Sequence, residues 1–333
     1  MIQRTACLVS RSLDAWRNQA VEKHLMDTLP EDTAVLFLWQ NQRSVWLGRG
    51  EDAGEACHLE ELTRQKGQLA RRLSGGGALY LDPGCLGYSL IVPKCAFDIP
   101  RQMSVLGMGL GAFGLQTCTG GACDVGVAGQ CVGRNAFFKS GSAAWQHGAL
   151  LVESDLETLN ALVAPDGQQR FASVQNLRSL ADGVTVDSLE RSLCQAFAHA
   201  YGSQPAWLDE RMLDGRTIDA LAQRFAAERW LTPSQPAASF TVSERFPWGG
   251  ATVRFATESG VIRHAQLYTD AMEAALFERI GPALVGAPFL ISAITARFDQ
   301  ALEWLSDPRL MQMAQDVCNL ICRRIRTSDR QGL

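Results

Sequence analysis

The sequence predicts an α+β protein of two domains, and three observations support this class. Helical and β-type runs are mixed over roughly the first 230 residues. After a proline-bearing stretch at 231–238, three β-like runs precede three helical runs, which is an α+β layout. The chain has 333 residues, and this length favours two domains over one. We therefore expect a large first domain over 1–230, with a mixed sheet, and a small accessory domain over 240–330.

Periodicity and capping residues place the elements of the first domain. A helix is expected over 14–28, where Asp14 can cap the first turn. Strands at 34–39 and 44–47 follow, joined by a polar turn. Further along we expect helices at 55–67, 101–116, 186–201 and 215–228, strands at 86–92, 136–140 and 148–152, a glycine- and cysteine-rich segment at 117–135, a capping box at Ser154 and Glu157, and a helix end at Gly202.

The second domain reads as strands and then helices. Strands are expected at 240–246, 251–257 and 261–268, and helices at 271–281, 291–304 and 308–326. The prolines of 231–238 make this stretch the expected linker between the domains.

Composition excludes several classes of function. A formal net charge of −4 provides no broad basic face, so we expect no nucleic acid partner. No apolar run reaches the roughly 18–20 residues of a membrane span, so we expect no membrane partner. The ten cysteines form no Cys-x-x-Cys pair and several lie in apolar runs, which favours a reduced cytoplasmic location and no metal site.

The stretch from Arg71 to Asp82 carries the clearest functional signal. Two arginines and a serine precede three glycines and a β-type run. Convergent backbone N–H groups can bind an anion, and arginine adds a forked donor for phosphate or carboxylate. The alternative is a glycine-rich hairpin turn with solvated arginines.

Motifs over most of the chain resemble those of the two-domain bacterial lipoate–protein ligase A family. The loop Arg71-Arg72-x-Ser74-Gly-Gly-Gly77-Ala78 matches the ligand loop of that family, and Asp14-x-Trp16-x-Asn18-x-Ala20-x-Glu22 matches its opening helix. Further resemblances are Leu36-Phe-Leu-Trp39, Gly48-Arg49, Ser140-Gly141-Ser142-Ala143, His147-Gly148, Glu244-Arg245-Phe246-x-Trp248-Gly249-Gly250, Gly260 and Thr269-Asp270.

The resemblance implies a mixed-sheet domain like that of biotin ligases and a small accessory domain. It also implies activation of lipoate or octanoate by ATP and Mg²⁺ to an acyl-AMP, followed by transfer to a lysine. The implied acceptors are the lipoyl domains of 2-oxoacid dehydrogenase complexes or the glycine cleavage H protein. The implied ligand-binding residues are Arg72, Ser74, Gly75, Gly76, Gly77, Ala78, Leu79, Tyr80, Asp124, Ser140, Gly141, Ser142, Ala143 and His147.

The sequence departs from the family where the chemistry is expected. The family places a lysine three residues before the glycine of Ser140-Gly141-Ser142-Ala143, and this chain has Phe138 there. Lys139 lies one residue later, on the opposite side of a regular strand. Lys139 would reach the site only through a bulge, and otherwise it is a surface lysine. Other departures are Gly121-Ala122-Cys123-Asp124, Leu81 in place of a histidine, and short segments at 144–146 and 172–177.

Three cysteines lie close to the strand expected to begin at Asp124, namely Cys118, Cys123 and Cys131. Related lipoyl amidotransferases use a cysteine nucleophile upstream of that strand, and Cys118 is roughly placed for this role. A nucleophilic cysteine needs a lowered pKa. The alternatives are a metal cluster or unreactive thiols. For His147 the alternatives are a packed strand-end histidine and a general base.

Three functions follow from these observations. The first is ATP-dependent attachment of lipoate or octanoate to lipoyl domains, which the intact glycine loop favours. The second is a non-catalytic relative that binds lipoyl domains or lipoyl compounds, which Phe138 favours. The third is a cysteine-dependent lipoyl or octanoyl transferase.

Overall fold

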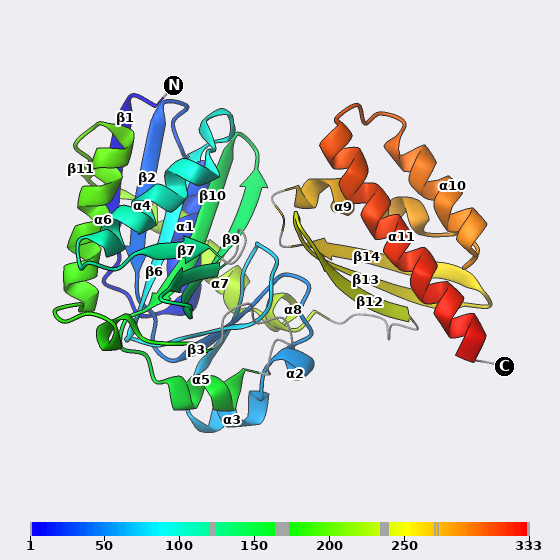
Figure 1. Ribbon diagram of the computed structural model, residues 1–333, viewed down its shortest axis with the longest axis horizontal. Helices are drawn as coiled ribbons and strands as arrows, with labels where there is room; N and C mark the ends of the chain where they lie inside the picture. The colour runs from blue at the N-terminus through cyan, green and yellow to red at the C-terminus, as the bar shows by residue number, and fades with distance from the viewer. Residues whose placement is uncertain are drawn as a thin grey trace. The chain divides into compact units, whose positions relative to one another are not determined.

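The chain folds into two compact units, Met1–Thr232 and Pro233–Leu333. The structure is a computed structural model, and it describes residues 2–119, 124–163, 173–233, 240–269, 271 and 273–331 (Figure 1). The first unit contains a mixed eight-stranded sheet with helices on both faces, and the second contains a three-stranded antiparallel sheet with helices. Both units match the α+β class that the sequence predicts.

The large sheet has the strand order β11-β1-β2-β6-β10-β9-β8-β7. Strands β11, β1 and β2 run parallel, and every later neighbour pair is antiparallel. The strands are β1 (Arg4–Val9), β2 (Thr33–Trp39), β6 (Cys85–Pro93), β7 (Thr117–Thr119), β8 (Asp124–Val127), β9 (Gln130–Ser140), β10 (Ala143–Leu151) and β11 (Ala206–Trp207). Within the glycine- and cysteine-rich segment 117–135, the strand expected to begin at Asp124 forms as β8, and β7 and the start of β9 are additional strands that the sequence did not predict.

A second, three-stranded sheet stands beside the large one and has the order β4-β3-β5. Its strands are β3 (Ser44–Leu47), β4 (Gln68–Arg71) and β5 (Leu79–Leu81). The strands expected at 34–39 and 44–47 both form, but they belong to different sheets. The cause is that β2 pairs on both edges, with β1 and β6, so it has no free edge for β3.

Helices cover both faces of the large sheet (Figure 1). Helices α4 (Ile99–Gly111) and α6 (Val186–Tyr201) enclose one apolar core, and α1 (Ala15–Asp27) and α7 (Gly215–Ala226) enclose the other. Asp14 caps α1 through the Arg17 N–H, and Gly202 ends α6 with a φ of +65°, as the sequence predicts. The remaining helices of this unit are α2 (Ala53–Ala56), α3 (Leu59–Arg64), α5 (Leu156–Leu162), α8 (Glu228–Leu231) and the 3₁₀ turns Lys94–Ala96, Leu177–Ser179 and Glu210–Met212.

Two local predictions were wrong in detail. The single helix expected over 55–67 is divided into the short helices α2 and α3. The cap of α5 is Asp155, which accepts the Thr158 N–H, and not Ser154. The Ser154 hydroxyl instead donates to Asp82, at 3.2 Å, and is therefore unavailable as a cap.

The second unit packs one sheet against helices around its own core. Its strands are β12 (Phe240–Phe246), β13 (Gly249–Glu258) and β14 (Val261–Thr269), and its helices are α9 (Ala274–Leu284), α10 (Ile291–Leu302) and α11 (Pro308–Gln331). The strand and helix positions expected from the sequence are confirmed. Strand β13 alternates between buried and partly exposed residues, as expected for a sheet covered by helices on one face.

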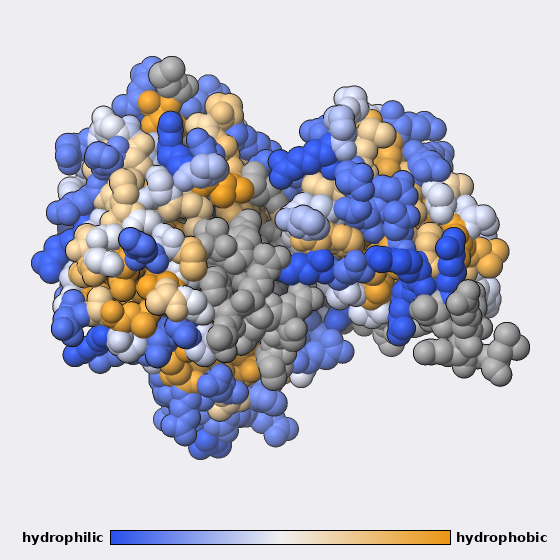
Figure 2. Space-filling model, in the orientation of Figure 1, coloured by the Kyte–Doolittle hydropathy of each residue, from blue (hydrophilic) through white to orange (hydrophobic). Residues whose placement is uncertain are grey.

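The surface is that of an ordinary globular protein. Hydrophilic and hydrophobic residues are interspersed over the visible face of each unit (Figure 2). None of the helices in the described ranges is both long and apolar enough to cross a membrane. Nine cysteines lie in the described ranges and all are free thiols.

Gly148 in β10 allows the closest approach between central strands. A Cβ at this position would lie 2.0 Å from the Arg134 carbonyl oxygen and 2.7 Å from the Tyr88 hydroxyl. We predict that Gly148→Ala lowers the free energy of unfolding of the first unit by about 3 kcal/mol, because the strands must separate. Urea unfolding measures the change. Gly111→Ala is the control, because nothing lies within 4 Å of its added Cβ, and it should lose no stability.

Candidate functional site

The glycine loop between β4 and β5 is organised around the side chain of Arg72. Its Nε donates to the Gly75 carbonyl at 3.0 Å, and its Nη2 donates to the carbonyls of Gly75 and Gly77 at 2.8 and 2.7 Å. Its Nη1 donates to the Trp46 carbonyl at 2.8 Å. Arg72 is buried, and these carbonyl dipoles offset part of the cost of burying its charge. The guanidinium therefore determines which way the peptide groups of the loop face.

The opposite side of these peptides is open to a ligand. The N–H groups of Gly75, Gly76 and Gly77 make no hydrogen bond to any residue in the described ranges. Gly76 has a φ of +91°, in the left-handed region that favours glycine. Successive N–H groups in such a turn form a concavity that can bind an anion.

Arg71 anchors the loop from the other side and is equally buried. Its Nε donates to the Leu231 carbonyl at 2.9 Å, at the end of α8, and Trp230 donates back to the Arg71 carbonyl at 2.8 Å. Its Nη1 donates to three carbonyls of the turn after β3, those of Gly48, Arg49 and Glu51. This turn presses on the glycine loop, since a Cβ on Gly48 would lie 1.7 Å from the Gly76 oxygen. The alternative of solvated arginines is therefore wrong for Arg71 and Arg72.

A chain of buried hydrogen bonds connects the loop to β10 and α1. The Ser74 hydroxyl lies 2.6 Å from Nε2 of His147, and Nδ1 of His147 lies 2.7 Å from Oε1 of Glu22. All three side chains are at most 3 % exposed. His147 is therefore a packed histidine that contacts the ligand loop directly.

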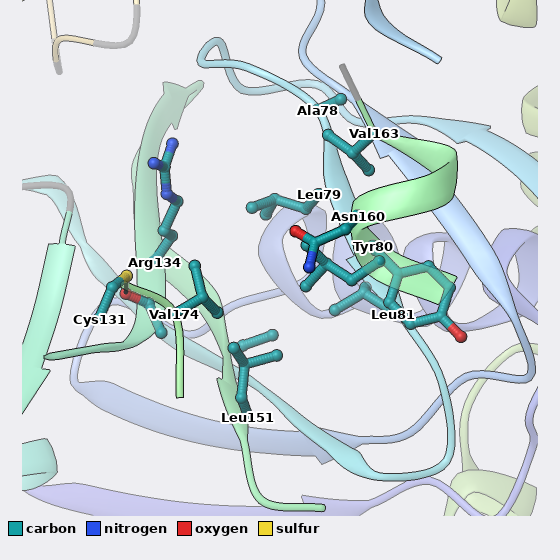
Figure 3. Close-up of a pocket in the computed structure, with 13 residues that line it drawn as sticks. Ala78, Leu79, Tyr80, Leu81, Cys131, Arg134, Leu151, Asn160, Val163 and Val174 are labelled. Carbon is teal, nitrogen blue, oxygen red and sulfur yellow. Dashed lines mark hydrogen bonds between the residues drawn. The ribbon is translucent and has the colours of Figure 1, made fainter. Parts of the chain in front are cut away.

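A cavity of about 150 Å³ opens between β5, β9, β10 and α5 (Figure 3). Arg134 rises from β9 on one side of it, and the residues of α5 lie on the other side (Figure 3). Most of its wall is apolar, and the lining residues are Ala78, Leu79, Tyr80, Leu81, Cys131, Gly133, Arg134, Ala149, Leu151, Leu159, Asn160, Val163 and Val174. Such a wall suits an aliphatic chain with one polar end.

A β-bulge in β9 determines which side chains face this cavity. Val125 of β8 pairs with Gly133 and Gly126 pairs with Cys131, so Val132 has no partner on β8. The extra residue reverses the alternation of side chains along the strand. Cys131 and Arg134, three residues apart, therefore both line the cavity, and Val132 enters the core on the opposite face.

The cavity and the hydrogen-bonded chain lie on the same face of β10. His147 precedes Ala149 by two residues, so the two side chains point to one side, about 7 Å apart along the strand. Ala149 lines the cavity. The site therefore combines an apolar cavity, a glycine loop held by Arg72 and a buried serine–histidine–glutamate chain of hydrogen bonds.

The comparisons with known proteins assign the chain to a family. A family model of the lipoyl protein ligase A/B catalytic domain matches residues 14–198. The chain belongs to this family. A second model, the bacterial lipoate protein ligase C-terminus, matches residues 235–306.

Solved structures with the same fold include lipoate ligases with different ligands. The P. falciparum protein LipL1, in complex with lipoate, superposes with a TM-score of 0.80 at 20 % identity over 95 % of this chain and 99 % of that chain. A bipartite lipoate protein ligase from Thermoplasma acidophilum, described with its E2 lipoyl domain, gives 0.60 at 23 % over 72 % and 100 %. A lipoate–protein ligase A bound with ATP gives 0.60 at 22 % over 70 % and 99 %.

The structure brings part of the predicted ligand set together. Ala78, Leu79 and Tyr80 line the cavity, and Arg72, Ser74 and the three glycines form the adjoining loop. Tyr80 contributes its ring, because its hydroxyl points away from the other lining residues (Figure 3). Burial raises the pKa of this hydroxyl, so it remains protonated at neutral pH.

The other predicted residues lie elsewhere. Ser140, Gly141, Ser142 and Ala143 form the tight turn between β9 and β10. Ser140 is six residues beyond Arg134, which on a strand is about 20 Å. Asp124 begins β8, and its side chain lies outside the described residues, as does all of Cys123.

Lys139 lies on the face of β9 opposite the cavity, whereas Phe138 lies on the same face as Arg134, four residues farther along the strand. The pairing of β9 with β10 runs from Ser140 to Gly133 without a register shift, so no bulge turns Lys139 over. Its Nζ lies 5.8 Å from the centre of the Phe97 ring. Phe138, on the other face, packs on Trp145 with ring centres 5.1 Å apart. Whether either residue affects activity stays a prediction.

Sequence reasoning missed the residues that the bulge brings in. Arg134 and Cys131 line the cavity, whereas Cys118 is exposed on β7. The sequence indicated Glu22 only as part of a helix motif, although Glu22 contacts His147, which in turn contacts Ser74. Strict alternation along β9 would have placed Cys131 and Arg134 on opposite faces, so the sequence held no direct signal for this pair.

The positive φ of Gly76 generates a test of the loop. We predict that Gly76→Val abolishes binding of ATP and of lipoate while the chain stays folded, because a β-branched residue resists φ of +91° and turns the peptide. Calorimetric titration measures the affinity. Gly54→Ala, whose added Cβ makes only an ordinary 3.4 Å contact, should bind like the wild type. Equal affinity in folded Gly76→Val would contradict the role of the loop.

Proposed function

We propose that the chain activates lipoate or octanoate with ATP and transfers the acyl group to a lysine of a lipoyl domain. The observation that carries the proposal is the contact between an apolar cavity and a loop with outward N–H groups, inside a lipoyl ligase catalytic domain. The apolar cavity suits the hydrocarbon end of an acyl carboxylate, and the N–H groups of the loop suit its carboxylate end.

The cavity supports the acyl specificity. Leu79, Leu81, Leu151 and Leu159 provide an aliphatic wall. Burial of each methylene against such a wall contributes about 0.8 kcal/mol, so an eight-carbon chain gains far more than a short acid. The carboxyl end would then lie toward the glycine loop.

The loop and Arg134 support the phosphate chemistry. The N–H groups of Gly75, Gly76 and Gly77 would hold phosphate or carboxylate oxygens, and Arg134 would place a cation at the cavity wall. Preorganised donors of this kind stabilise charge that develops in the transition state. Mg²⁺ would accompany the phosphates of ATP, since this ion is commonly held by phosphates and one or two carboxylates.

The reaction has two balanced steps. A carboxylate oxygen attacks the α-phosphorus of ATP, and pyrophosphate leaves to give the acyl-AMP. The amine of the acceptor lysine then attacks the acyl carbon, AMP leaves, and the amine loses a proton as the amide forms. The proposed acceptors are lipoyl domains of 2-oxoacid dehydrogenase complexes or the glycine cleavage H protein, in the cytoplasm. We propose that 1–230 carries the ligand site and 240–330 is an accessory domain.

A second candidate is a binding protein without turnover. It is favoured by the cavity wall, which includes no lysine among the described residues. Phe138 lies on the cavity face of β9 but carries no charge, and Lys139 lies on the opposite face, so neither would supply that charge.

Pyrophosphate release in the presence of lipoate, ATP and Mg²⁺ distinguishes the two candidates. We predict release by the wild type, a fall of about 10²–10³ in rate for Arg134→Ala, and little change for Lys139→Ala, because only Arg134 lines the cavity. Binding of lipoate and ATP without release would identify the binding protein. Loss of activity in Lys139→Ala alone would contradict the assigned role of Arg134.

A third candidate, acyl transfer through a cysteine, is favoured by Cys131 and not by Cys118. The Cys131 thiol lines the cavity, and the side chain is buried. In this route the thiolate would attack an acyl thioester, the donor thiol would leave, and the lysine amine would then displace Cys131. Incubation with an octanoyl thioester should add one octanoyl group, detected by mass spectrometry, which Cys131→Ser loses and Cys118→Ser retains. Absence of the adduct in the wild type would eliminate this candidate.

A further inference from the structure

The buried chain of hydrogen bonds from Ser74 through His147 to Glu22 extends beyond Glu22. Oε1 of Glu22 accepts a hydrogen bond from Ser89 at 2.5 Å as well as the contact with His147 at 2.7 Å. The Ser89 hydroxyl in turn accepts from Nε1 of Trp39 at 3.1 Å. Five elements of the fold therefore meet in one hydrogen-bonded chain, namely β2, β6, α1, β10 and the glycine loop.

The chemistry of the end group fixes the direction of every bond. An indole nitrogen can only donate, so the Ser89 hydroxyl accepts from Trp39 and donates its own proton to Glu22. Oε1 of Glu22 accepts from Ser89, and if Glu22 is a carboxylate, which has only acceptors, Nδ1 of His147 is the donor to it. In the neutral imidazole Nε2 is then the acceptor, and it takes the proton of Ser74.

The described surroundings of His147 contain a single acidic side chain. The elements packed around the ring contribute Ala136 from β9, Ser89 from β6, Trp145 from β10, Ser74 from the loop and Glu22 from α1. Among these described neighbours Glu22 is the one acidic side chain, so we assign to it the choice of which ring nitrogen carries the proton.

We infer that Glu22 is a positioning residue for the ligand loop and acts through His147. By holding the proton on Nδ1, Glu22 keeps Nε2 free to accept from Ser74 and so fixes the loop at its first residue. Arg72 fixes the loop at the carbonyls of Gly75 and Gly77, and the two contacts together hold the intervening N–H groups in place. The inference rests on the proposed function only where it concerns ligand affinity.

The first experiment reads the proton directly. In protein labelled with ¹⁵N-histidine, NMR distinguishes the two ring nitrogens, and His147→Gln assigns the signal. We expect the proton on Nδ1 in the wild type and in Glu22→Gln, whose amide oxygen can still accept. We expect it on Nε2 in Glu22→Met, which removes the acceptor at similar volume. A proton on Nε2 of His147 in the wild type would contradict the direction that we assign to the hydrogen bonds between Ser74, His147 and Glu22.

The second experiment measures the loop without any ligand. The Arg49 N–H donates to the Ser74 carbonyl at 2.9 Å, so its hydrogen exchange reports whether the start of the loop is held. We expect exchange about tenfold faster in Glu22→Met and in Ser74→Ala, and less than threefold faster in Glu22→Gln. Ser89→Ala is the matched control, because it removes the other donor to Glu22 and leaves the path to Ser74 intact.

A double mutant separates positioning from general stability. If Glu22 acts on the loop through Ser74, adding Glu22→Met to Ser74→Ala should change Arg49 exchange less than twofold. Two outcomes would show a merely structural role and overturn the inference. One is that the double mutant multiplies the exchange increases of the single mutants, and the other is that Ser89→Ala and Glu22→Met accelerate Arg49 exchange equally. If Glu22→Met does not fold, the exchange of the Arg49 N–H is compared between Ser74→Ala and Ser89→Ala instead. Equal exchange in these two variants also overturns the positioning role of Glu22.

The affinity of the variants for ATP with Mg²⁺ then tests whether the hydrogen bonds from Glu22 to Ser74 matter for the proposed function. We expect the dissociation constant to rise about tenfold in Glu22→Met, in Ser74→Ala and in the double mutant alike, and to stay unchanged in Ser89→Ala. If the wild type binds neither ATP nor lipoate while the exchange pattern holds, the proposed function fails and the positioning role stands. If ATP binds equally to all variants and Arg49 exchange is also equal, the positioning role fails and the proposed function stands.

Discussion

The site depends first on one buried guanidinium, that of Arg72. Left alone, a charge this deeply buried would cost several kcal/mol. The carbonyls of Trp46, Gly75 and Gly77 offset that cost with short, charge-assisted bonds. In a trans peptide the N–H points opposite to the carbonyl of the preceding residue, so turning the Gly75 and Gly77 carbonyls toward Arg72 turns the N–H groups of Gly76 and Ala78 away from it. A cation on the inside thus creates an anion site on the outside.

The opening helix gives this arrangement its second support. Trp16 donates to the Leu69 carbonyl and Gln19 to the Arg71 carbonyl, both at 2.8 Å, so α1 is bonded along β4. Glu22 follows one turn later and reaches His147. The motif over 14–22 therefore supports the site from behind, although the cavity lining includes none of its residues. Its buried polar residues are satisfied by β4, by His147 and Ser89, and, for Asn18, by Ser12, Gln40 and Asn41.

Features that depend on neighbouring residues could be predicted from the sequence, and features that depend on pairing could not. Asp14, Gly202 and the strand at 44–47 form as predicted, because a cap or a short apolar run acts locally. The glycine loop over 72–78 could be singled out from the sequence, and its binding of a ligand stays a prediction, but the sequence did not show that its arginines face inward. The unpaired Val132 could not be predicted, because a bulge exists only relative to the partner strand. Without it, the sequence placed the functional end of β9 near Ser140, about 20 Å from Arg134.

The bond between Arg71 and Leu231 connects the end of the first unit to the glycine loop. The Leu231 carbonyl and the Trp230 indole are both held by Arg71, at the strand end from which the glycine loop departs. The first unit ends one residue later, at Thr232. Arg71 therefore joins the last helix of this unit, the turn after β3 and the strand that leads into the glycine loop. One buried side chain thus makes the integrity of the glycine loop depend on the segment at which the unit ends.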